Sequence, residues 1–465
     1  MSKLTFLPLI WIFINNVFSQ TYITRNEALE DIDYFFRQAE QIHPDLYFKV
    51  SKTDMQTKIL DLKKSVKDSI SIDEFSKKLS AVVNLIGDAH TNIGISKHLR
   101  KKYYREKTRL PFGVKISGNT FYVSKPETEK LKEGDIIVSV NNIKSNDFNK
   151  LTRYVVCDIE SQKPKFLGKY FSYYFFIEYE ISDSINITVN RNGKIITTQL
   201  TLNAYRKKPR GKYDFFRIND TVAVLKINSF ANINKKHYKS FLDSIFNRLS
   251  DNKNLTTLVI DLKNNGGGTT SYAVMLFPYI NVTTYRLHQK YEIKTGKAVK
   301  KYFGKRYIKW FMYPFYPFAY FSRMGRIYFF KKNGSITSIA TKERRLKAKS
   351  NAFKGKVYVL TSAGTYSAAA DFVYAFSYSK RGKIIGDTVG QPYTGYIDRI
   401  PVTLPNSKLR GGVSFKRYEY VGANENNKHQ GISPDLYFDA DNYKNEAELY
   451  DGLTSKIRNA GRLTP

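Results

Sequence analysis

The chain has 465 residues and is poor in cysteine, in acidic residues and in long apolar runs. Its one cysteine, Cys157, excludes an intrachain disulfide, and we interpret this thiol as a small buried residue rather than a nucleophile. The 41 acidic residues face 76 lysines and arginines, so the formal net charge is +35. That charge favours anionic partners, namely nucleic acid, an anionic envelope surface or acidic peptides. The alternative is a lysine-rich surface that is merely solvated.

The N-terminus carries the one long apolar run. The basic start "MSK" is followed by "LTFLPLIWIFINNVF" and then by "SQ", a pattern typical of a secretory signal peptide over residues 1–19. No later segment has enough consecutive apolar residues to span a bilayer. We therefore expect an exported protein, periplasmic or secreted and not cytoplasmic. Export argues against a nucleic-acid partner in spite of the charge.

Two different patterns follow the signal peptide. Residues 20–105 are predicted to be a helical region, in which Ile32 and Phe35 share one helix face and Ser71 begins a second helix. Residues 106–205 consist of short alternating runs such as "FGVKI" and "DIIVSVN". They contain Asn192-Gly193, a strong signal for a two-residue hairpin. This second region is predicted to be a small β-rich module.

Strands and helices alternate along residues 206–445. The segments "LTTLVIDL" and "KVYVLTS" predict buried strands, whereas "HYKSFLDSIFNRL" and "SAAADFVYAFSYS" predict helices. Such alternation indicates an α/β core with a mostly parallel sheet. Residues 446–465 are predicted to be a C-terminal tail.

A basic and aromatic segment, residues 281–355, interrupts this core. It holds 19 lysines and arginines against two acids, Glu292 and Glu343, so its net charge of +17 is about half of the total. Its centre, "KWFMYPFYPFAYFSRMGRIYFF", is aromatic, with prolines three residues apart. Basic flanks around an aromatic patch suit an anionic membrane surface. The alternative, which we favour at this point, is an insertion whose rings pack on the core while its lysines face water.

One serine stands where a predicted strand meets a predicted helix. In "VLTSAGTYSAAADF", Ser367 follows a strand and small turn residues and opens an alanine-rich helix. A strand-to-helix turn exposes the hydroxyl, and a helix N-terminus stabilises nearby negative charge. Ser367 is therefore a candidate nucleophile, although an ordinary helix cap explains the same position.

A glycine-rich turn ends another strand of the same predicted sheet. In "LVIDLKNNGGGTT", a buried strand is followed by Asn265, Gly266, Gly267 and Gly268. Consecutive glycines let a ligand approach the backbone closely and can direct N–H groups at a developing oxyanion. No Gly-Lys-Ser/Thr follows, so the turn is not a phosphate loop. A flexible turn without a function is the alternative.

The third pattern is an Asp-x-His motif in "LIGDAHTNI", where His90 follows Asp88. A serine needs a base to be nucleophilic at neutral pH, and the sequence has only six histidines. No histidine or cysteine pair at metal-ligand spacing accompanies the motif, so we expect no metal. A lone histidine is otherwise a structural residue.

Together these patterns resemble the family of tail-specific, or carboxy-terminal processing, serine peptidases, which includes the core of the tricorn protease. The segments "HPDLYF" and "LIGDAHTNI" are similar to its N-terminal helical region, and "LKEGDIIVSVNNIK" to part of a PDZ-like module. The later segments "VAVLKINSF", "LVIDLKNNGGG", "VYVLTSAGTYSAAADF", "IIGDTVGQPYTGY" and "GISPDLYF" are similar to successive core segments. The resemblance covers nearly all of the mature chain and implies a ClpP/crotonase-like α/β core.

The resemblance leaves a choice of base. Some members pair the serine with a downstream lysine, but here the stretch "GDTVGQPYTG" holds Gln391 and no lysine. The tricorn-like branch takes its base from a histidine after the N-terminal helices, a position that His90 matches. In that branch a glutamate shortly before Gly-x-x-Pro-Asp orients the histidine. In "GANENNKHQGISPD" Glu425 lies a few residues early, and Asp88 and Glu419 are the alternatives.

The activity implied by the resemblance is that of a serine-type peptidase of the tricorn-like branch, which cleaves peptides or proteins through an acyl-enzyme without metal or organic cofactor. The implied site residues are Ser367 as nucleophile, His90 as base, Glu425 as third member, Gly267 and Ala368 as oxyanion hole, and Asn265, Gly266 and Gly268 as substrate contacts. Two alternatives stay open. One is a non-catalytic peptide- or envelope-binding protein on the same fold, and the other is hydrolysis of a small ester or amide by the same serine.

Overall fold

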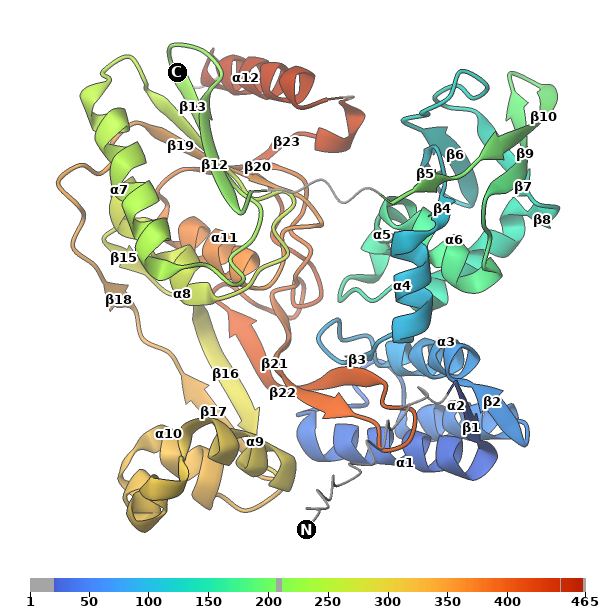
Figure 1. Cartoon of the computed structure of the whole chain (residues 1–465). Coiled ribbons are helices and arrows are strands. Elements are labelled where there is room, and N and C mark those ends of the chain that lie inside the picture. Colours follow the sequence, from blue (N-terminus) through green and yellow to red (C-terminus); the bar gives the residue numbers. More distant parts are fainter. Residues whose placement is uncertain (1–20, 206–210, 444, 463–465) are drawn as a thin grey trace, which may run out of the picture.

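The computed structural model describes residues 21–205, 211–443 and 445–462. The predicted signal peptide therefore lies outside the described residues. Within them the chain has a mixed α/β fold in which a helical region, a β-rich module, an α/β core and a peripheral lobe surround a common centre (Figure 1). None of the described helices is long and apolar enough to cross a membrane.

The core is built on a six-stranded sheet. In sheet order its strands are β12 (Tyr213–Arg217), β13 (Val222–Ile227), β14 (Thr257–Asp261), β19 (Lys356–Thr361), β20 (Lys383–Gly386) and β23 (Leu436–Tyr437). The β12–β13 pair is antiparallel, and the other pairs are parallel. Every residue of β14 is buried, as expected for a central strand that helices cover on both faces.

Alternating side chains of these strands enter two separate hydrophobic clusters. Leu258 and Ile260 pack beneath α7 (Lys235–Asp251), α8 (Thr270–Val274) and α11 (Ala368–Ser379). Val259 between them faces α12 (Glu446–Arg462) on the other side of the sheet. This period of two is what places helices on both faces. The segment predicted to be a tail thus forms helix α12, whose Leu449, Tyr450 and Leu453 are buried.

The β-rich module contains an antiparallel sheet in the order β10-β9-β7-β6-β5. Its strands are β5 (Gly113–Ser117), β6 (Thr120–Ser124), β7 (Ile136–Val140), β9 (Ser184–Arg191) and β10 (Lys194–Thr201), with β8 (Ile143–Lys144) beside β7. The predicted hairpin is present, because Asn192 and Gly193 take φ values of 51° and 86° between β9 and β10. Helices α5 (Lys163–Lys169) and α6 (Phe171–Tyr179) pack on this sheet, although the alternating pattern indicated strands alone.

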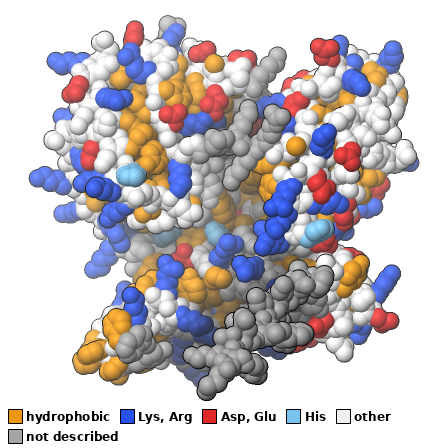
Figure 2. Space-filling model, in the orientation of Figure 1, with side chains coloured by type: hydrophobic (Ala, Val, Ile, Leu, Met, Phe, Trp, Pro, Cys, Tyr) orange, Lys and Arg blue, Asp and Glu red, His pale blue; other side chains and the backbone are white. Residues whose placement is uncertain are grey.

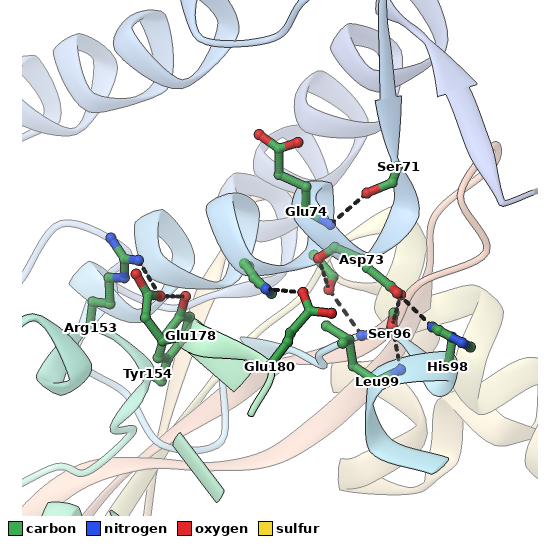
Figure 3. Close-up of polar contacts among 12 residues, drawn as sticks. Ser71, Asp73, Glu74, Ser96, His98, Leu99, Arg153, Tyr154, Glu178 and Glu180 are labelled. Atoms are coloured by element: carbon green, nitrogen blue, oxygen red, sulfur yellow. Dashed lines mark hydrogen bonds and ion pairs between the residues drawn. The ribbon is translucent and has the colours of Figure 1, made fainter. Parts of the chain in front are cut away.

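The N-terminal helices α1 (Arg25–Ile42), α2 (Lys52–Lys64) and α3 (Ile72–Val83) form the helical region. Ser71 caps α3 by accepting a hydrogen bond from the Glu74 N–H at 3.1 Å. Figure 3 shows how the carboxylate of Asp73 joins this helix to the next segment, through Ser96 and through His98 Nδ1 at 2.6 Å. From the same helix Lys77 forms a 2.7 Å salt bridge with Glu180 at the end of α6, which fixes the helical region to the module.

The insertion leaves the core and returns to the N-terminal helices. Strands β16 (His288–Lys294) and β17 (Ile336–Ala340) extend a sheet with the long hairpin of β21 (Thr394–Thr403) and β22 (Arg410–Tyr420). Between β16 and β17 lies a lobe of α9 (Lys297–Tyr307), a 3-10 helix η5 (Trp310–Phe321), α10 (Arg323–Gly325) and a π-helix η6 (Arg326–Phe330). Residues of this lobe, of α1 and of β22 share one hydrophobic cluster.

The rings of the insertion therefore fall into two groups. Phe303 is buried and stacks on Tyr328, with ring centroids 3.9 Å apart, and it meets Phe415 of β22 edge to face at 5.3 Å. Phe318 of η5, in contrast, is 65% exposed. The sequence-based expectation that the aromatic residues pack on the core thus describes only part of the segment.

Phe303→Ala is expected to lower the free energy of unfolding by about 3–4 kcal/mol, because it removes a ring that joins the lobe to β22 and leaves a cavity. Phe318→Ala is the matched control and should change it by less than about 0.5 kcal/mol. Chemical denaturation followed by fluorescence measures both values. Equal effects of the two substitutions would contradict this account of the packing.

Candidate active site

Ser367 occupies a strained turn between strand β19 and helix α11. Its φ of 54° and ψ of −126° lie in a region that side-chain-bearing residues rarely adopt. Strain of this kind costs about 1–3 kcal/mol and persists only where the surroundings enforce it. The Ser367 side chain makes no helix-capping hydrogen bond. The helix-cap alternative therefore does not account for this serine.

The glycine turn lies directly against the serine. A Cβ atom on Gly267 would stand 2.5 Å from the Ser367 Cβ and 2.7 Å from the Tyr366 carbonyl oxygen, so only glycine fits there. Its φ of 103° also favours glycine. Asn265 holds the turn in place: its Oδ1 accepts a 2.9 Å hydrogen bond from the Gly267 N–H, and its Nδ2 donates to the Ile227 carbonyl.

These contacts change what two of the predicted residues can do. Asn265 is fully buried and its amide is engaged on both sides, so it shapes the turn and does not face a substrate. The Gly267 N–H, predicted for the oxyanion hole, already donates to Asn265. The N–H groups of Gly268 and Ala368, by comparison, find no acceptor among the described residues.

Gln391 fixes the backbone of Ser367 from the other side. This fully buried side chain accepts a 2.7 Å hydrogen bond from the Ser367 N–H through Oε1, and it donates through Nε2 to the Tyr420 hydroxyl at 2.8 Å. Tyr420 in turn donates to Asp371 at 2.5 Å. The stretch in which a lysine base would be expected therefore supplies a neutral amide that positions the serine.

The His90 loop is held by a buried carboxylate. Asp88 Oδ1 accepts a 2.9 Å hydrogen bond from the His90 N–H, and Oδ2 accepts one from the Thr91 hydroxyl at 2.5 Å. His43 Nε2 lies 3.3 Å from the same oxygen, with both side chains fully buried. Although burial alone would raise the pKa of Asp88, the contact with His43 holds it below the ordinary value. Asp88 thus supports the loop and not the imidazole ring.

The imidazole ring of His90 stacks on Tyr366, the residue before the nucleophile, with ring centroids 5.1 Å apart. The Tyr366 hydroxyl lies 3.1 Å from His90 Nδ1 and donates to Asp158 Oδ2 at 2.5 Å. A phenol has one proton, so the bond to Asp158 leaves the Tyr366 oxygen to accept from His90 Nδ1–H. This arrangement selects the tautomer whose Nε2 carries a lone pair.

Asp158 is the acidic residue that sequence reasoning missed. It belongs to the link between η2 (Ser145–Tyr154) and η3 (Glu160–Gln162) of the β-rich module, and Oδ1 accepts a 2.8 Å hydrogen bond from the Ala89 N–H. Burial, reinforced by the negative charge of Asp88, raises its pKa to about 6. No local motif marks this position.

Glu425 and Glu419 do not reach this arrangement. The Glu425 side chain is 88% exposed and pairs with Lys428 at 2.6 Å on the same loop. Glu419 lies within the sheet and pairs with Lys290 at 3.1 Å. Neither contacts His90 or Ser367 among the interactions of the described residues. The part of the chain that the structure describes also contains no cluster of three side chains able to hold a metal ion.

Ser367 and His90 are neighbours through Tyr366, but no hydrogen bond between Ser367 Oγ and His90 occurs in the described part of the chain. A serine on a strained turn, a glycine turn packed against it and an oriented histidine define a site of the serine-hydrolase class.

Comparison with known proteins specifies this class. The model of peptidase family S41 matches residues 221–438, and this core segment is similar to that family of tail-specific serine peptidases. This match supports a serine-type peptidase. No curated protein sequence matches it.

Two solved structures of CPAF share the fold. A crystal structure of mature CPAF has a TM-score of 0.62 at 12% identity and covers 93% of this chain and 96% of that one. CPAF complexed with lactacystin gives 0.61 at 12% identity, over 94% and 98%. The photosystem II D1 C-terminal processing protease gives 0.45 at 15% identity, over 89% and 93%. At these identities the CPAF likeness shows a common fold.

Gly267→Ala is expected to lower the rate at which a fluorophosphonate labels Ser367 by at least about 100-fold, because the added Cβ displaces the Ser367 side chain. Gly266→Ala is the matched control, since a Cβ there meets open space. Labelling kinetics, with circular dichroism to verify folding, give the comparison. Similar losses in both variants would contradict this role for Gly267.

Proposed function

We propose that the chain is an exported serine peptidase in which Ser367 attacks a peptide carbonyl and His90 is the base. The observation that carries the proposal is the hydrogen-bonded series His90–Tyr366–Asp158 beside the strained serine. It leaves His90 Nε2 as the one ring nitrogen able to take a proton. Closure of the Ser367–His90 contact accompanies substrate binding, as is common for catalytic hydrogen bonds that are long in the free enzyme.

The chemistry follows from these positions. The Ser367 hydroxyl proton passes to His90 Nε2 while Oγ bonds to the carbonyl carbon. The carbonyl oxygen becomes an oxyanion that the Ala368 N–H, at the N-terminus of α11, stabilises. His90 then gives its proton to the leaving amine, and the C–N bond breaks to leave an acyl-enzyme. Water, deprotonated by the same histidine, hydrolyses this ester.

The second oxyanion donor is assigned to the glycine turn. Gly268 supports this assignment better than Gly267, because its N–H has no acceptor among the residues that the structure describes while the Gly267 N–H is taken by Asn265. Gly266, whose backbone is exposed, stays a candidate for contact with the substrate main chain.

We assign the third catalytic position to Asp158 instead of Glu425. Its carboxylate stabilises the imidazolium form of His90 through the Tyr366 hydroxyl, whereas Glu425 points into solvent. The antiparallel module that supplies Asp158 is proposed to be PDZ-like and to receive a peptide by strand addition. The core is proposed to be ClpP/crotonase-like, and residues 1–19 to be the signal peptide.

A non-catalytic peptide-binding protein on this fold is the second candidate, and the missing Ser367–His90 hydrogen bond favours it. The two functions separate in one experiment. An enzyme is labelled by a fluorophosphonate at Ser367 and loses labelling in Ser367→Ala. A binding protein is not labelled, and its peptide affinity survives Ser367→Ala. Turnover of small esters without peptide cleavage would indicate the hydrolase alternative.

Substitutions in the hydrogen-bonded series His90–Tyr366–Asp158 are expected to lower the rate of peptide hydrolysis to different degrees. His90→Ala should lower kcat/KM by about 10³-fold or more, and Tyr366→Phe by about 10–100-fold, because the phenylalanine keeps the stack but cannot orient the imidazole. Tyr378→Phe near the end of α11, which loses a 2.7 Å bond to Glu343, is the control and should be neutral. Full activity of His90→Ala would exclude it as the base.

Asp158→Asn should change how the free energy of unfolding depends on pH. The folded pKa of about 6 lies above the ordinary 3.8, so the ionised carboxylate destabilises the folded state above pH 6, and this cost is relieved as the pH falls from 6 to 4. The asparagine variant has no such dependence. Its free energy of unfolding relative to the wild type should therefore rise by about 1–2 kcal/mol between pH 4 and pH 7. If urea titrations show that the difference in free energy of unfolding between variant and wild type does not change with pH, the ionised Asp158 carboxylate does not destabilise the folded state.

A further inference from the structure

The lobe between β16 and β17 carries an exposed ridge of apolar side chains. Helix η5 (Trp310–Phe321) is a 3-10 helix, in which residues three apart lie on one face. Met312, Phe315, Phe318 and Phe321 follow that spacing and are 38%, 64%, 65% and 77% exposed. The ring centroids of Phe315 and Phe318 are 6.4 Å apart, and those of Phe318 and Phe321 are 6.2 Å apart. These four residues, the η5 ridge, form one continuous apolar surface.

The η5 ridge is held outward by the opposite face of the same helix. Tyr316 contacts Phe329 and Phe330, with centroid distances of 5.5 and 5.3 Å. Gly325 comes so near to the helix that a Cβ there would stand 1.9 Å from the Ala319 carbonyl oxygen. Pro314 and Pro317 lie within η5 and restrict its backbone. The ridge is therefore preformed, and its exposure follows from packing behind it.

Cations flank the η5 ridge along the sequence. Residues 297–332 contain ten lysines and arginines and no aspartate or glutamate. Those nearest the ridge are exposed, among them Lys309, Arg323, Lys331 and Lys332. Arg326 lies over the Tyr320 ring at 5.9 Å and donates to the Phe321 carbonyl. Figure 2 shows apolar side chains gathered at the tip of this lobe with Lys and Arg beside them.

The apolar ridge and its basic flanks together indicate which kind of partner binds this surface. A second copy of the chain would bring two acid-free basic lobes together, and like charges oppose that contact. An acidic peptide would use the cations but leave the phenylalanine ridge in water. An anionic bilayer satisfies both, because rings enter the interface while lysine and arginine meet headgroup phosphates.

We propose that the η5 ridge docks the protein on the surface of a bilayer of anionic phospholipid. Phe315, Phe318 and Phe321 enter the interfacial region, and the basic residues that flank η5 contact the headgroups. The lobe lies outside the catalytic residues, so docking is independent of peptide hydrolysis and goes beyond the proposed function. It places a peptidase at a membrane without a membrane-spanning helix in the described residues.

The test is co-sedimentation of the mature chain with vesicles of phosphatidylglycerol and phosphatidylcholine, and with vesicles of phosphatidylcholine alone. The wild type should bind the anionic vesicles at least about tenfold better, and about 0.5 M salt should weaken that binding. The triple variant Phe315→Ser, Phe318→Ser, Phe321→Ser should lose at least about tenfold in affinity. A matched control, Ile195→Ser with Tyr437→Ser, removes exposed apolar side chains elsewhere and should bind as the wild type does.

Three outcomes would overturn the proposal. The first is no wild-type binding to anionic vesicles, and the second is undiminished binding by the triple variant. The third is a wild-type dimer in sedimentation that the triple variant abolishes, which would assign the ridge to a second copy of the chain. Fluorophosphonate labelling of Ser367 in all variants verifies that the core is intact.

Discussion

The Tyr366 hydroxyl is the contact on which the site depends. It lies between His90 of the helical region and Asp158 of the β-rich module, and its own residue precedes the nucleophile in the core. One oxygen therefore joins three parts of the fold that have separate hydrophobic clusters. Because the hydroxyl has a single proton, its bond to Asp158 also decides which nitrogen of His90 is protonated. Orientation and protonation of the His90 imidazole, the proposed base, follow from the same interaction.

The conformation of Ser367 depends on a second set of contacts that compensates its backbone strain. The glycine turn packs against the serine where a Cβ on Gly267 would collide with it, and Gln391 accepts a hydrogen bond from the Ser367 N–H in a fully buried position. Gln391 is itself anchored through Tyr420 to Asp371. A neutral amide there suits a histidine-based site, because a lysine would introduce a competing cation beside the nucleophile. The buried amide of Gln391 is thus compatible with His90 as the proposed base.

Sequence reasoning identified the residues that carry local patterns. Ser367, the glycine turn and His90 each stand in a recognisable stretch, and the strand–helix alternation predicted an α/β protein. Asp158 and Tyr366 could not be predicted, since their roles arise from contacts between segments about 70 to 210 residues apart and no spacing encodes those contacts. Glu425 was selected because it precedes a motif, but a loop position says nothing of where a side chain points. Helix α12 was missed because its apolar stripe is short and follows a polar stretch.

The hairpin of β21 and β22 affects the order in which the site assembles during folding. Thr91, next to His90, accepts its hydrogen bond from the Ser414 N–H, and the N-terminal helices complete their core with β22 residues such as Phe415. These contacts join parts of the chain more than 300 residues apart, so they form late in folding. A chain emerging from the ribosome has its histidine loop long before it has the strand that holds this loop. The histidine loop therefore reaches its final position only after the β21–β22 hairpin has been synthesised.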